Sequence, residues 1–192
     1  MGITQIDNNV SIYPMPVVLA GAVVNGQANF LAIGWISRVS SRPPMLAMAL
    51  NKTHYTNGGI REHKEFSVNV PSIDLIEKVD YCGLVSGREA DKSKLFEVFY
   101  GKLRNAPLIR ECPLCLGCTL IETVSLPSND LFIGEIMEAY ADERILTAGS
   151  PDITKLRPFT LTMPDNIYWK VGEKVGRAWD AGRKLIGNEP GE

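Results

Sequence analysis

The chain has 192 residues and a mass of 21.1 kDa, a size at which a single domain buries about 70% of the surface that its unfolded form exposes. Apolar residues make up 45% and charged residues 22% of the chain, which is typical of a folded globular protein rather than of a disordered or fibrous one. The net charge is only −2 and basic residues do not cluster, which argues against nucleic acid as a partner.

The sequence also predicts a protein that works away from membranes. Its longest wholly apolar stretch covers residues 17–24, far fewer than the roughly 20 residues that span a bilayer. The beginning of the chain lacks the basic segment and long apolar core of a secretory signal, so we expect a cytoplasmic protein whose four cysteines stay reduced. We predict one domain over residues 1–187 and a mobile polar tail over residues 188–192.

The strongest structural signal is a β-hairpin near the beginning of the chain. Residues 17–24 and 27–33 are largely apolar and flank Asn25-Gly26, a pair that tolerates positive φ at both turn positions. After Pro43-Pro44 a series of shorter elements is expected. We predict a strand over 45–50, a turn at Asn57-Gly58-Gly59, a short helix over 60–64 and a half-buried strand over 66–70.

The second half of the chain predicts two small helices and then further strands. Ser72 is placed to cap a helix that runs from Ile73 to about Tyr81, and residues 91–99 favour another helix. Strands are predicted over 114–125, 131–139 and 158–163. Neighbouring strands, hairpin turns and few crossover helices indicate a mainly β protein with a closed antiparallel barrel rather than a parallel sheet.

The segment from residue 29 to residue 56 sets polar side chains between apolar runs. An aromatic ring system needs apolar walls and a few aimed donors, whereas a terminal phosphate needs hydroxyls, backbone N–H groups and a Lys or Arg. The segment carries both kinds of group: Trp35 for the ring, and for the phosphate Ser37, Ser40, Ser41, Thr53, Thr56, Arg38 and Lys52. It therefore predicts a pocket for a flat, phosphorylated ligand, with solvent-facing hydroxyls along a strand as the alternative.

A series of short motifs in a specific order carries a family resemblance. They are the run from Asn29 through Trp35 to Pro44, then Lys52-Thr53, Ser67-Val-Asn-Val-Pro71, Asp80-Tyr-Cys-Gly83, Ser86-Gly87, Asp91-Lys92, Ala106-Pro107-Leu108, Leu116-Gly-Cys118 and Phe132-Ile-Gly-Glu135. With these motifs the chain resembles the flavin reductase-like family of FMN-binding split barrels, and its flavoredoxin branch most of all. The resemblance implies an antiparallel, six-stranded, Greek-key-like split β-barrel with small inserted helices. It also implies a homodimer in which each barrel binds one FMN near the subunit interface.

The resemblance further implies which residues hold the cofactor. Beside the ring and ribityl chain it places Asn29, Trp35, Ser37, Arg38, Val39 and Ser40. Toward the phosphate it places Lys52, Thr53 and Thr56, with Asn69 closing the same region. Ser86 and Lys92 resemble positions that in this family come near the flavin. Because a flavin supplies the redox chemistry itself, no catalytic acid or base is required. Two positions depart from the family pattern. Ala32 stands where relatives often carry a hydroxyl, which removes one hydrogen bond to the flavin. Asn129 stands where many relatives carry a histidine, so a role of that imidazole in proton or hydride handling is in question for this chain.

Three functions stay open at this point. The chain is either an oxidoreductase that moves electrons from NAD(P)H through FMN to flavin, ferric iron or a protein, or an electron carrier that a partner protein reduces. The third alternative is an iron–sulfur or metal protein that uses Cys112, Cys115 and Cys118, with Cys82 as a fourth ligand. A spacing of three sends Cys112 and Cys115 to opposite faces of a strand, which favours packed thiols instead.

The cations and the histidines of the chain lead to two further hypotheses. Reduced flavin carries negative charge on its pyrimidine side, so a cation placed there, such as Arg38 or Lys92, would favour the reduced state. The two histidines, His54 and His63, are expected at the surface or in loops, with His54 inside the presumed phosphate loop.

Overall fold

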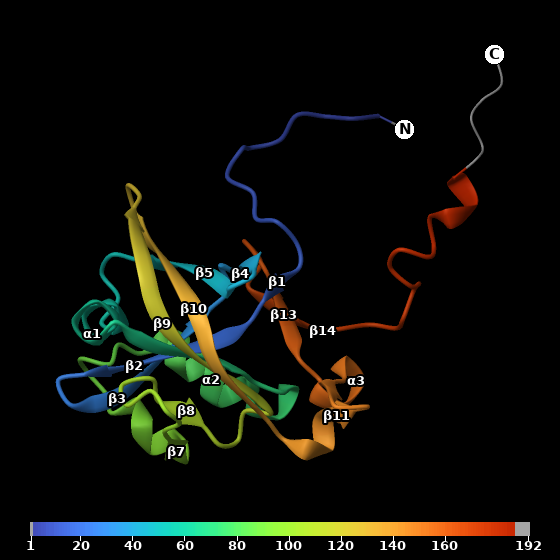
Figure 1. Cartoon of the computed structure of the whole chain (residues 1–192). Coiled ribbons are helices and arrows are strands. Elements are labelled where there is room, and N and C mark those ends of the chain that lie inside the picture. Colours follow the sequence, from blue (N-terminus) through green and yellow to red (C-terminus); the bar gives the residue numbers. More distant parts are fainter. Residues whose placement is uncertain (1, 187–192) are drawn as a thin grey trace.

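The structure, a computed structural model, describes residues 2–186, so the tail predicted over 188–192 lies outside the described residues. Its largest element is a seven-stranded antiparallel sheet with the spatial order β3-β2-β6-β9-β10-β5-β4 (Figure 1). In that order the strands are Gln27–Ile33, Val18–Val24, Glu65–Val70, Leu114–Ser125, Asn129–Ala141, Pro44–Asn51 and Ile36–Ser41.

The two edge strands of this sheet, β3 and β4, are neighbours in the chain. Only Gly34 and Trp35 separate them, so the sheet has to curl until its two edges approach each other. The Ala49 N–H donates to the Trp35 carbonyl at 2.9 Å, which ties this connection to β5. The prediction of a mainly β, antiparallel fold is confirmed. The sheet has seven strands rather than six, and the barrel is split because β3 and β4 are not paired.

Smaller elements surround the sheet. A three-stranded sheet joins β1 (Met15–Pro16), β13 (Phe159–Thr162) and β14 (Ile167–Lys170). Two ribbons pair β7 (Val98–Phe99) with β8 (Leu108–Ile109), and β11 (Leu146–Thr147) with β12 (Ser150–Pro151). The helices are α1 (Thr56–His63), α2 (Ile76–Leu84) and α3 (Ile153–Leu156), with single 3₁₀ turns at Ile73–Leu75, Lys92–Leu95, Glu143–Ile145 and Arg183–Leu185.

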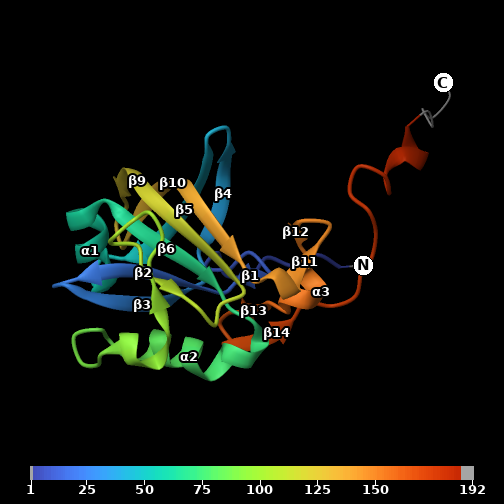
Figure 2. The same cartoon turned by 60° about the horizontal axis from the view of Figure 1, so that its bottom comes forward.

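Strand β2 is buried on both faces because α2 covers the outside of the curled sheet (Figure 2). Val18 and Ala20 point into the barrel, where they pack with Phe66 in one apolar core. Leu19 points the other way and packs with Val79 of α2 in a second core. Two-sided burial explains why residues 17–24 form a continuous apolar run instead of alternating with polar residues.

The turn predicted at Asn57-Gly58-Gly59 is wrong, because these residues lie inside α1. Asn57 is buried, and its Nδ2 donates to the Asn51 carbonyl at 2.8 Å. A Cβ at Gly59 would lie 2.1 Å from the carbonyl oxygen of Val23, so only glycine lets the helix rest directly on β2. Contact with the sheet therefore overrides the poor helix propensity of two consecutive glycines.

The helix predicted over 91–99 is also wrong. Asp91 does cap a turn, since its Oδ1 accepts from the Ser93 N–H at 3.1 Å, but the turn ends at Leu95. Phe96 then enters the second core, where its ring meets Phe30 edge to face at 5.4 Å. The chain continues as β7, which pairs with β8.

The other predicted elements are present. Asn25 and Gly26 have φ values of 51° and 77°, as the hairpin between β2 and β3 requires. The Ser72 hydroxyl accepts from the Asp74 N–H at 3.3 Å and caps the turn that leads into α2. Among residues 2–186, no helix has both the length and the apolar character needed to cross a membrane.

Candidate functional site

A polar pocket of about 390 Å³ lies where β3, the beginning of α1 and the loop after α2 meet. We define it by the residues that line it: Asn29, Leu31, Thr53, His54, Tyr55, Thr56, Gly83, Leu84, Val85, Ser86, Gly87, Arg88, Glu89 and Lys92. Its size falls within the range of small-molecule sites. Hydroxyls and positive charge are its main chemistry, which suits an anionic group.

The two sides of the polar pocket are held together by short, specific contacts. Asn29 is 5% exposed, and its Nδ2 donates to the Thr56 hydroxyl at 2.8 Å, which joins β3 to α1. A Cβ at Gly87 would lie 2.0 Å from the Asn29 Oδ1 and 2.8 Å from the Tyr55 ring. The loop after α2 therefore reaches the pocket only because residue 87 has no side chain.

Two cations enter the polar pocket from the same loop. Lys92 is 2% exposed, and its Nζ donates to the carbonyl oxygens of Phe30 at 3.0 Å and Cys82 at 2.8 Å. Burial lowers the pKa of Lys92 from its usual value, because the charged form loses its hydration. Those two bonds use two of its three N–H donors, so one remains for a ligand. Arg88 donates to the Thr53 carbonyl at 3.1 Å and stacks on Tyr55 at 5.1 Å.

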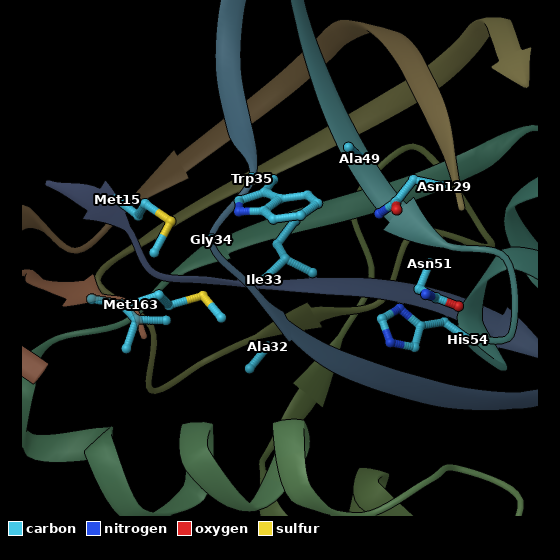
Figure 3. A pocket seen from close by; sticks show the side chains of 11 residues that line it. Met15, Ala32, Ile33, Gly34, Trp35, Ala49, Asn51, His54, Asn129 and Met163 are labelled. Atoms are coloured by element: carbon cyan, nitrogen blue, oxygen red, sulfur yellow. The ribbon is translucent and has the colours of Figure 1, made fainter. Parts of the chain in front are cut away.

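An apolar pocket of about 330 Å³ adjoins the first one (Figure 3). Five segments that are distant in the sequence supply its lining: Met15, Ala32, Ile33, Gly34, Trp35, Ala49, Asn51, His54, Asn129, Leu161 and Met163. The Trp35 side chain, which is 52% exposed, forms one wall. Aromatic and thioether side chains with few polar neighbours suit a flat ring system.

His54 lines both pockets and so marks their junction. It is not the solvated loop group that the sequence suggests, because its Nδ1 is buried and has no hydrogen-bond partner. Burial lowers the pKa of His54, and the charge of Lys92 lowers it further. A neutral imidazole with an unsatisfied nitrogen is therefore held between the two pockets, where a bound molecule can supply its partner.

The structure brings only some of the predicted site residues together. Five of them line the polar pocket: Asn29, Thr53, Thr56, Ser86 and Lys92. Trp35 walls the apolar pocket and also borders a third cavity, together with Ser37 and Val39.

The remaining four predicted residues line none of these cavities. Arg38 and Ser40 lie on β4, where the Arg38 Nε donates to the Ser40 carbonyl at 2.7 Å. Lys52 is exposed in the turn before α1. Asn69 is fully buried away from the pockets; its Nδ2 donates to the Ser67 hydroxyl at 2.9 Å and its Oδ1 accepts from the Ile109 N–H at 3.0 Å.

The sequence did not predict several of the residues that line the two pockets. Met15, Leu161 and Met163 reach the apolar pocket through the small sheet of β1, β13 and β14, and no local motif marks them. Arg88 has a local signal, since it directly follows the Ser86-Gly87 motif. Both positions that depart from the family pattern, Ala32 and Asn129, lie on the apolar pocket (Figure 3).

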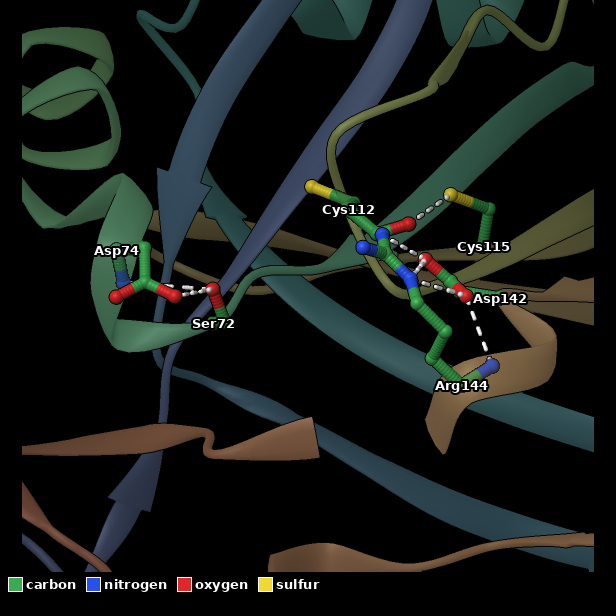
Figure 4. A network of polar contacts seen from close by, with 6 residues as sticks. All are labelled: Ser72, Asp74, Cys112, Cys115, Asp142 and Arg144. Carbon is green, nitrogen blue, oxygen red and sulfur yellow. Dashed lines mark hydrogen bonds and ion pairs between the residues drawn. The ribbon is translucent and has the colours of Figure 1, made fainter. Parts of the chain in front are cut away.

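The cysteines are divided between the two cores. Cys82, Cys112 and Cys115 pack in the second core, whereas Cys118 faces the barrel interior. The Cys115 S–H contacts the carbonyls of Ile109 at 3.2 Å and Cys112 at 3.5 Å (Figure 4). Burial raises the pKa of Cys82 to about 11 and those of Cys115 and Cys118 to about 12, which keeps these thiols protonated. Among residues 2–186, no group of three or more His, Cys, Asp or Glu side chains is placed to hold a metal ion.

Comparison with known proteins agrees with this geometry. A model of the flavin reductase-like domain matches residues 10–154, and the chain therefore belongs to the flavin reductase-like family. Within that family it falls into the flavoredoxin branch. The crystal structure of a flavoredoxin from Methanosarcina acetivorans is 54% identical and matches 96% of this chain and 100% of that chain, with a TM-score of 0.95.

Two further solved structures share the fold. The flavoredoxin of Desulfovibrio vulgaris (Miyazaki F) is 31% identical over 95% of this chain and 100% of that chain, with a TM-score of 0.87. An FMN-binding protein from Thermus thermophilus is 21% identical over 92% of this chain and 97% of that chain, with a TM-score of 0.78. At that identity the last match concerns the architecture alone.

Proposed function

We propose that the chain binds FMN across the two adjoining pockets and moves electrons through it. One observation carries this proposal: an apolar pocket walled by Trp35 and a polar pocket with the buried ammonium of Lys92 meet at His54. A flat ring system and a phosphate dianion require these two environments side by side. Membership of the flavin reductase-like family and the likeness to two flavoredoxins support the choice of a flavin.

The residues present fit such a cofactor. Thr53 and Ser86 offer hydroxyls, and Lys92 offers a free N–H and a positive charge, which are the groups that bind phosphate. Because Gly87 has no side chain, the loop after α2 approaches the Asn29 amide closely and brings Ser86 and Lys92 to the same pocket. The Nδ1 of His54 is a buried polar atom of the kind that a ligand satisfies.

When bound, FMN supplies the redox chemistry, since it takes up electrons from a donor and passes them to an acceptor. The chain's own residues bind and orient it. Lys92 is held by the Phe30 and Cys82 carbonyls, so its positive charge would be in place before the phosphate binds. Trp35 shields one side of the apolar pocket from water and leaves its outer side accessible.

The electron donor divides this proposal into two candidates. The first is an oxidoreductase that takes electrons from NAD(P)H and passes them to free flavin, ferric iron or a protein. The second is an electron carrier that a partner protein reduces. The second candidate is favoured by the identity of 54% to a protein named flavoredoxin, over 96% of this chain and 100% of that chain.

We also propose that the functional unit is a homodimer. The long β9–β10 hairpin projects from the body at its tip (Figure 1) and exposes Ile121, Val124 and Leu126. Beyond Leu120 the β9 side of this ribbon is a sheet edge, because β6 pairs with β9 only up to Thr119, so its exposed apolar side chains require a surface to pack on. A second copy, related by twofold symmetry, would offer the same ribbon in return.

The first experiment identifies the chromophore. Purified protein should be yellow, and its chromophore should be released on denaturation with the mass of FMN. Apoprotein should rebind FMN more tightly than riboflavin, because riboflavin lacks the phosphate that the polar pocket is proposed to hold. Equal affinity for the two, or no binding at micromolar concentration, contradicts the proposal.

A second experiment separates the two candidates. Anaerobic holoprotein is mixed with NADH or NADPH in a stopped-flow instrument, and the absorbance of bound FMN is followed. Bleaching within seconds supports the oxidoreductase. No bleaching within minutes, with full bleaching by dithionite as the control, supports the carrier.

A further inference from the structure

The two ends of the β13–β14 ribbon lead to different cavities. Leu161 and Met163, at one end, line the apolar pocket. At the other end Lys170 lies opposite Phe159, and α3 lies beside this end in both views (Figures 1 and 2). A cavity of about 350 Å³ opens there, which we call the α3 pocket. The residues that define it are Ile73, Ile153, Arg157, Pro158, Lys170 and Val171. It shares no lining residue with the polar and apolar pockets, so the proposed flavin site does not account for it.

The α3 pocket has aliphatic walls and only positive charge. Its apolar side chains are those of Ile73, Ile153, Pro158 and Val171. Its charged side chains are those of Arg157 and Lys170, and among residues 2–186 no Asp or Glu lines it. It also lacks the aromatic and thioether side chains of the apolar pocket, so a flat ring system finds no matching wall. These surroundings suit an aliphatic group that carries one anionic group.

Arg157 is held at the α3 pocket by the turn that leads into α2. Its Nη1 and Nη2 donate to the two carboxylate oxygens of Asp74, both at 2.9 Å, and its carbonyl accepts from the Ile73 N–H at 3.0 Å. The two contacts with Asp74 use two of the five N–H donors of the guanidinium, so three remain. A second carboxylate can therefore bind the same guanidinium through its free N–H groups.

The backbone of Arg157 is a second indication that its side chain binds a ligand. Arg157 ends α3 with a φ of 53°, in the left-handed region where glycine is the usual residue. The ion pair with Asp74 offsets little of this cost, because the two side chains are 49% and 63% exposed and water screens their attraction. Unfavourable backbone conformations of this kind gather at ligand clamps and active sites. The guanidinium is therefore expected to have a role besides its contact with Asp74.

Lys170 adds a second positive charge, which the protein does not neutralise. It is exposed at the end of β14, and in the part of the chain that the structure describes its ammonium has neither a hydrogen-bond nor an ion-pair partner. The whole chain has a net charge of −2, so a cavity with two cations and no lining carboxylate is a local exception. Such a cavity attracts anions.

The neighbouring cavity shows what balanced charge looks like on the same side of the molecule. It has a volume of about 470 Å³ and shares Arg157 with the α3 pocket. Its charged lining residues are the carboxylates Asp74, Glu111 and Asp142 and the cations Arg144, Lys155 and Arg157. The Arg144 Nε donates to both oxygens of Asp142 at 3.0 Å (Figure 4). Because its charges balance, that cavity offers an anion no net attraction, whereas the α3 pocket does.

We propose that the α3 pocket is a second ligand site, which binds a small aliphatic carboxylate. Arg157 and Lys170 bind the carboxylate, and the hydrocarbon part packs on the aliphatic walls. The volume lies at the lower end of the range for small-molecule sites, which favours a short chain over a long fatty acid. This proposal goes beyond the proposed function and does not depend on it, because the two sites share no residue.

Chemical-shift titration of isotope-labelled, full-length protein tests the proposal. The probe is isocaproate, a branched aliphatic acid, and an excess of FMN keeps the flavin pockets occupied. We expect saturable binding at millimolar concentration or below, with the largest shifts over residues 153–158 and 170–172. Isocaproamide, which has the same chain without the charge, should bind about tenfold more weakly. Acetate, which has the charge without the chain, should also bind more weakly.

Variants of the pocket show whether its cations bind the probe. Lys170→Gln should weaken isocaproate binding about tenfold, because it removes one of the two charges. Arg157→Gly should have a similar effect, and glycine adopts the φ of this position freely. Lys174→Gln is the matched control, since Lys174 is an exposed lysine that does not line the α3 pocket, and it should leave the affinity unchanged. If Arg157→Gly does not fold, Lys170→Gln decides.

Four results would overturn the proposal: no binding of isocaproate at millimolar concentration, equal affinity for isocaproate and isocaproamide, shifts confined to the polar and apolar pockets, or unchanged affinity in Lys170→Gln. The same titration without FMN separates this proposal from the proposed function. If the chain does not bind FMN, the proposed function fails, while isocaproate binding to the apoprotein still decides whether the α3 pocket is a ligand site.

Discussion

The polar and apolar pockets are adjacent, but they are built in opposite ways. The polar pocket comes mainly from two short stretches of chain, 53–56 and 83–92, whose side chains are already hydrogen-bonded to protein. The apolar pocket comes from five distant segments whose side chains meet through apolar surface. The polar pocket is preorganised and tolerates little change. The apolar pocket can adapt by shifting flexible side chains such as Met15 and Met163.

This contrast between the pockets predicts how strongly substitutions in each of them should affect cofactor binding. Changes in the polar pocket should cost more binding free energy than changes in the apolar pocket, because a charged ligand group that loses its partner cannot be satisfied by repacking. A change at their junction should alter the pH dependence more than the affinity. The four predictions below run from the largest expected effect to the smallest.

Gly87→Ala should have the largest effect on cofactor binding. The new Cβ would lie 2.0 Å from the Asn29 Oδ1, so the loop after α2 must move away from the pocket. We expect FMN affinity to fall about 100-fold, equivalent to losing one or two hydrogen bonds to a charged group. Fluorescence titration of apoprotein with FMN measures it. Gly58→Ala in α1 is the control, because nothing lies within 4 Å of its Cβ; equal affinity in both variants would contradict the role of Gly87.

Lys92→Met should weaken binding about tenfold, since it removes a buried cation from the polar pocket. It also leaves the Phe30 and Cys82 carbonyls without a donor, so unfolding free energy should fall by about 1–3 kcal/mol. The midpoint potential of bound FMN should fall as well, because positive charge favours the more negative reduced form. Redox titration checks this, and an unchanged potential would show that Lys92 acts on binding alone.

Trp35→Ala should have a smaller effect, because the apolar pocket can rearrange around the gap. We expect a loss of up to tenfold in FMN affinity, in line with about 0.5–1.5 kcal/mol for an aromatic pair. Trp35→Phe should retain most of the affinity. Trp169→Ala on β14 is the matched control, since its indole is equally exposed but lines neither pocket. A loss larger than that of Lys92→Met would reverse the proposed order.

The same contrast explains how much the sequence could predict. The polar pocket is sequence-local, so its hydroxyls and Lys92 stand in short motifs that are visible without a structure. The hairpin of β2 and β3 was predictable for the same reason, since Asn25-Gly26 fixes it locally. Met15 and Met163 join the apolar pocket only through pairing of β1 with β13, about 145 residues apart, and no local pattern encodes that contact.

Tertiary contacts explain one wrong prediction and the surroundings of one predicted site residue. Asn57-Gly58-Gly59 has the composition of a turn, but the close approach of Gly59 to Val23 makes it a helix. Asn69, which the family resemblance assigns to the cofactor region, is buried, and its amide bridges Ser67 and Ile109; its role toward a cofactor stays a prediction. A buried amide and a ligand-binding amide carry the same sequence signal, because both lie on an alternating strand.

The smallest predicted effect concerns His54, at the junction of the pockets. Burial and the charge of Lys92 lower the pKa of His54 in the folded chain. At pH values between this lowered pKa and the ordinary value of about 6.5, the unfolded chain therefore binds more protons than the folded chain. The stability that the neutral imidazole contributes is therefore complete above pH 6.5 and is lost as the pH falls through the folded pKa. The expected loss in apoprotein is on the order of 1 kcal/mol or less, because the side chain is partly exposed.

Denaturant unfolding of apoprotein at several pH values measures the contribution of His54 to the unfolding free energy. His54→Asn should flatten the dependence below pH 6.5, whereas His63→Asn, at the end of α1, should leave it in place. Bound FMN should reduce the same dependence in the unmodified protein, because a phosphate dianion near His54 raises its pKa against the effect of Lys92. If FMN leaves the pH dependence unchanged, His54 does not face the ligand, and the two pockets do not act as one site.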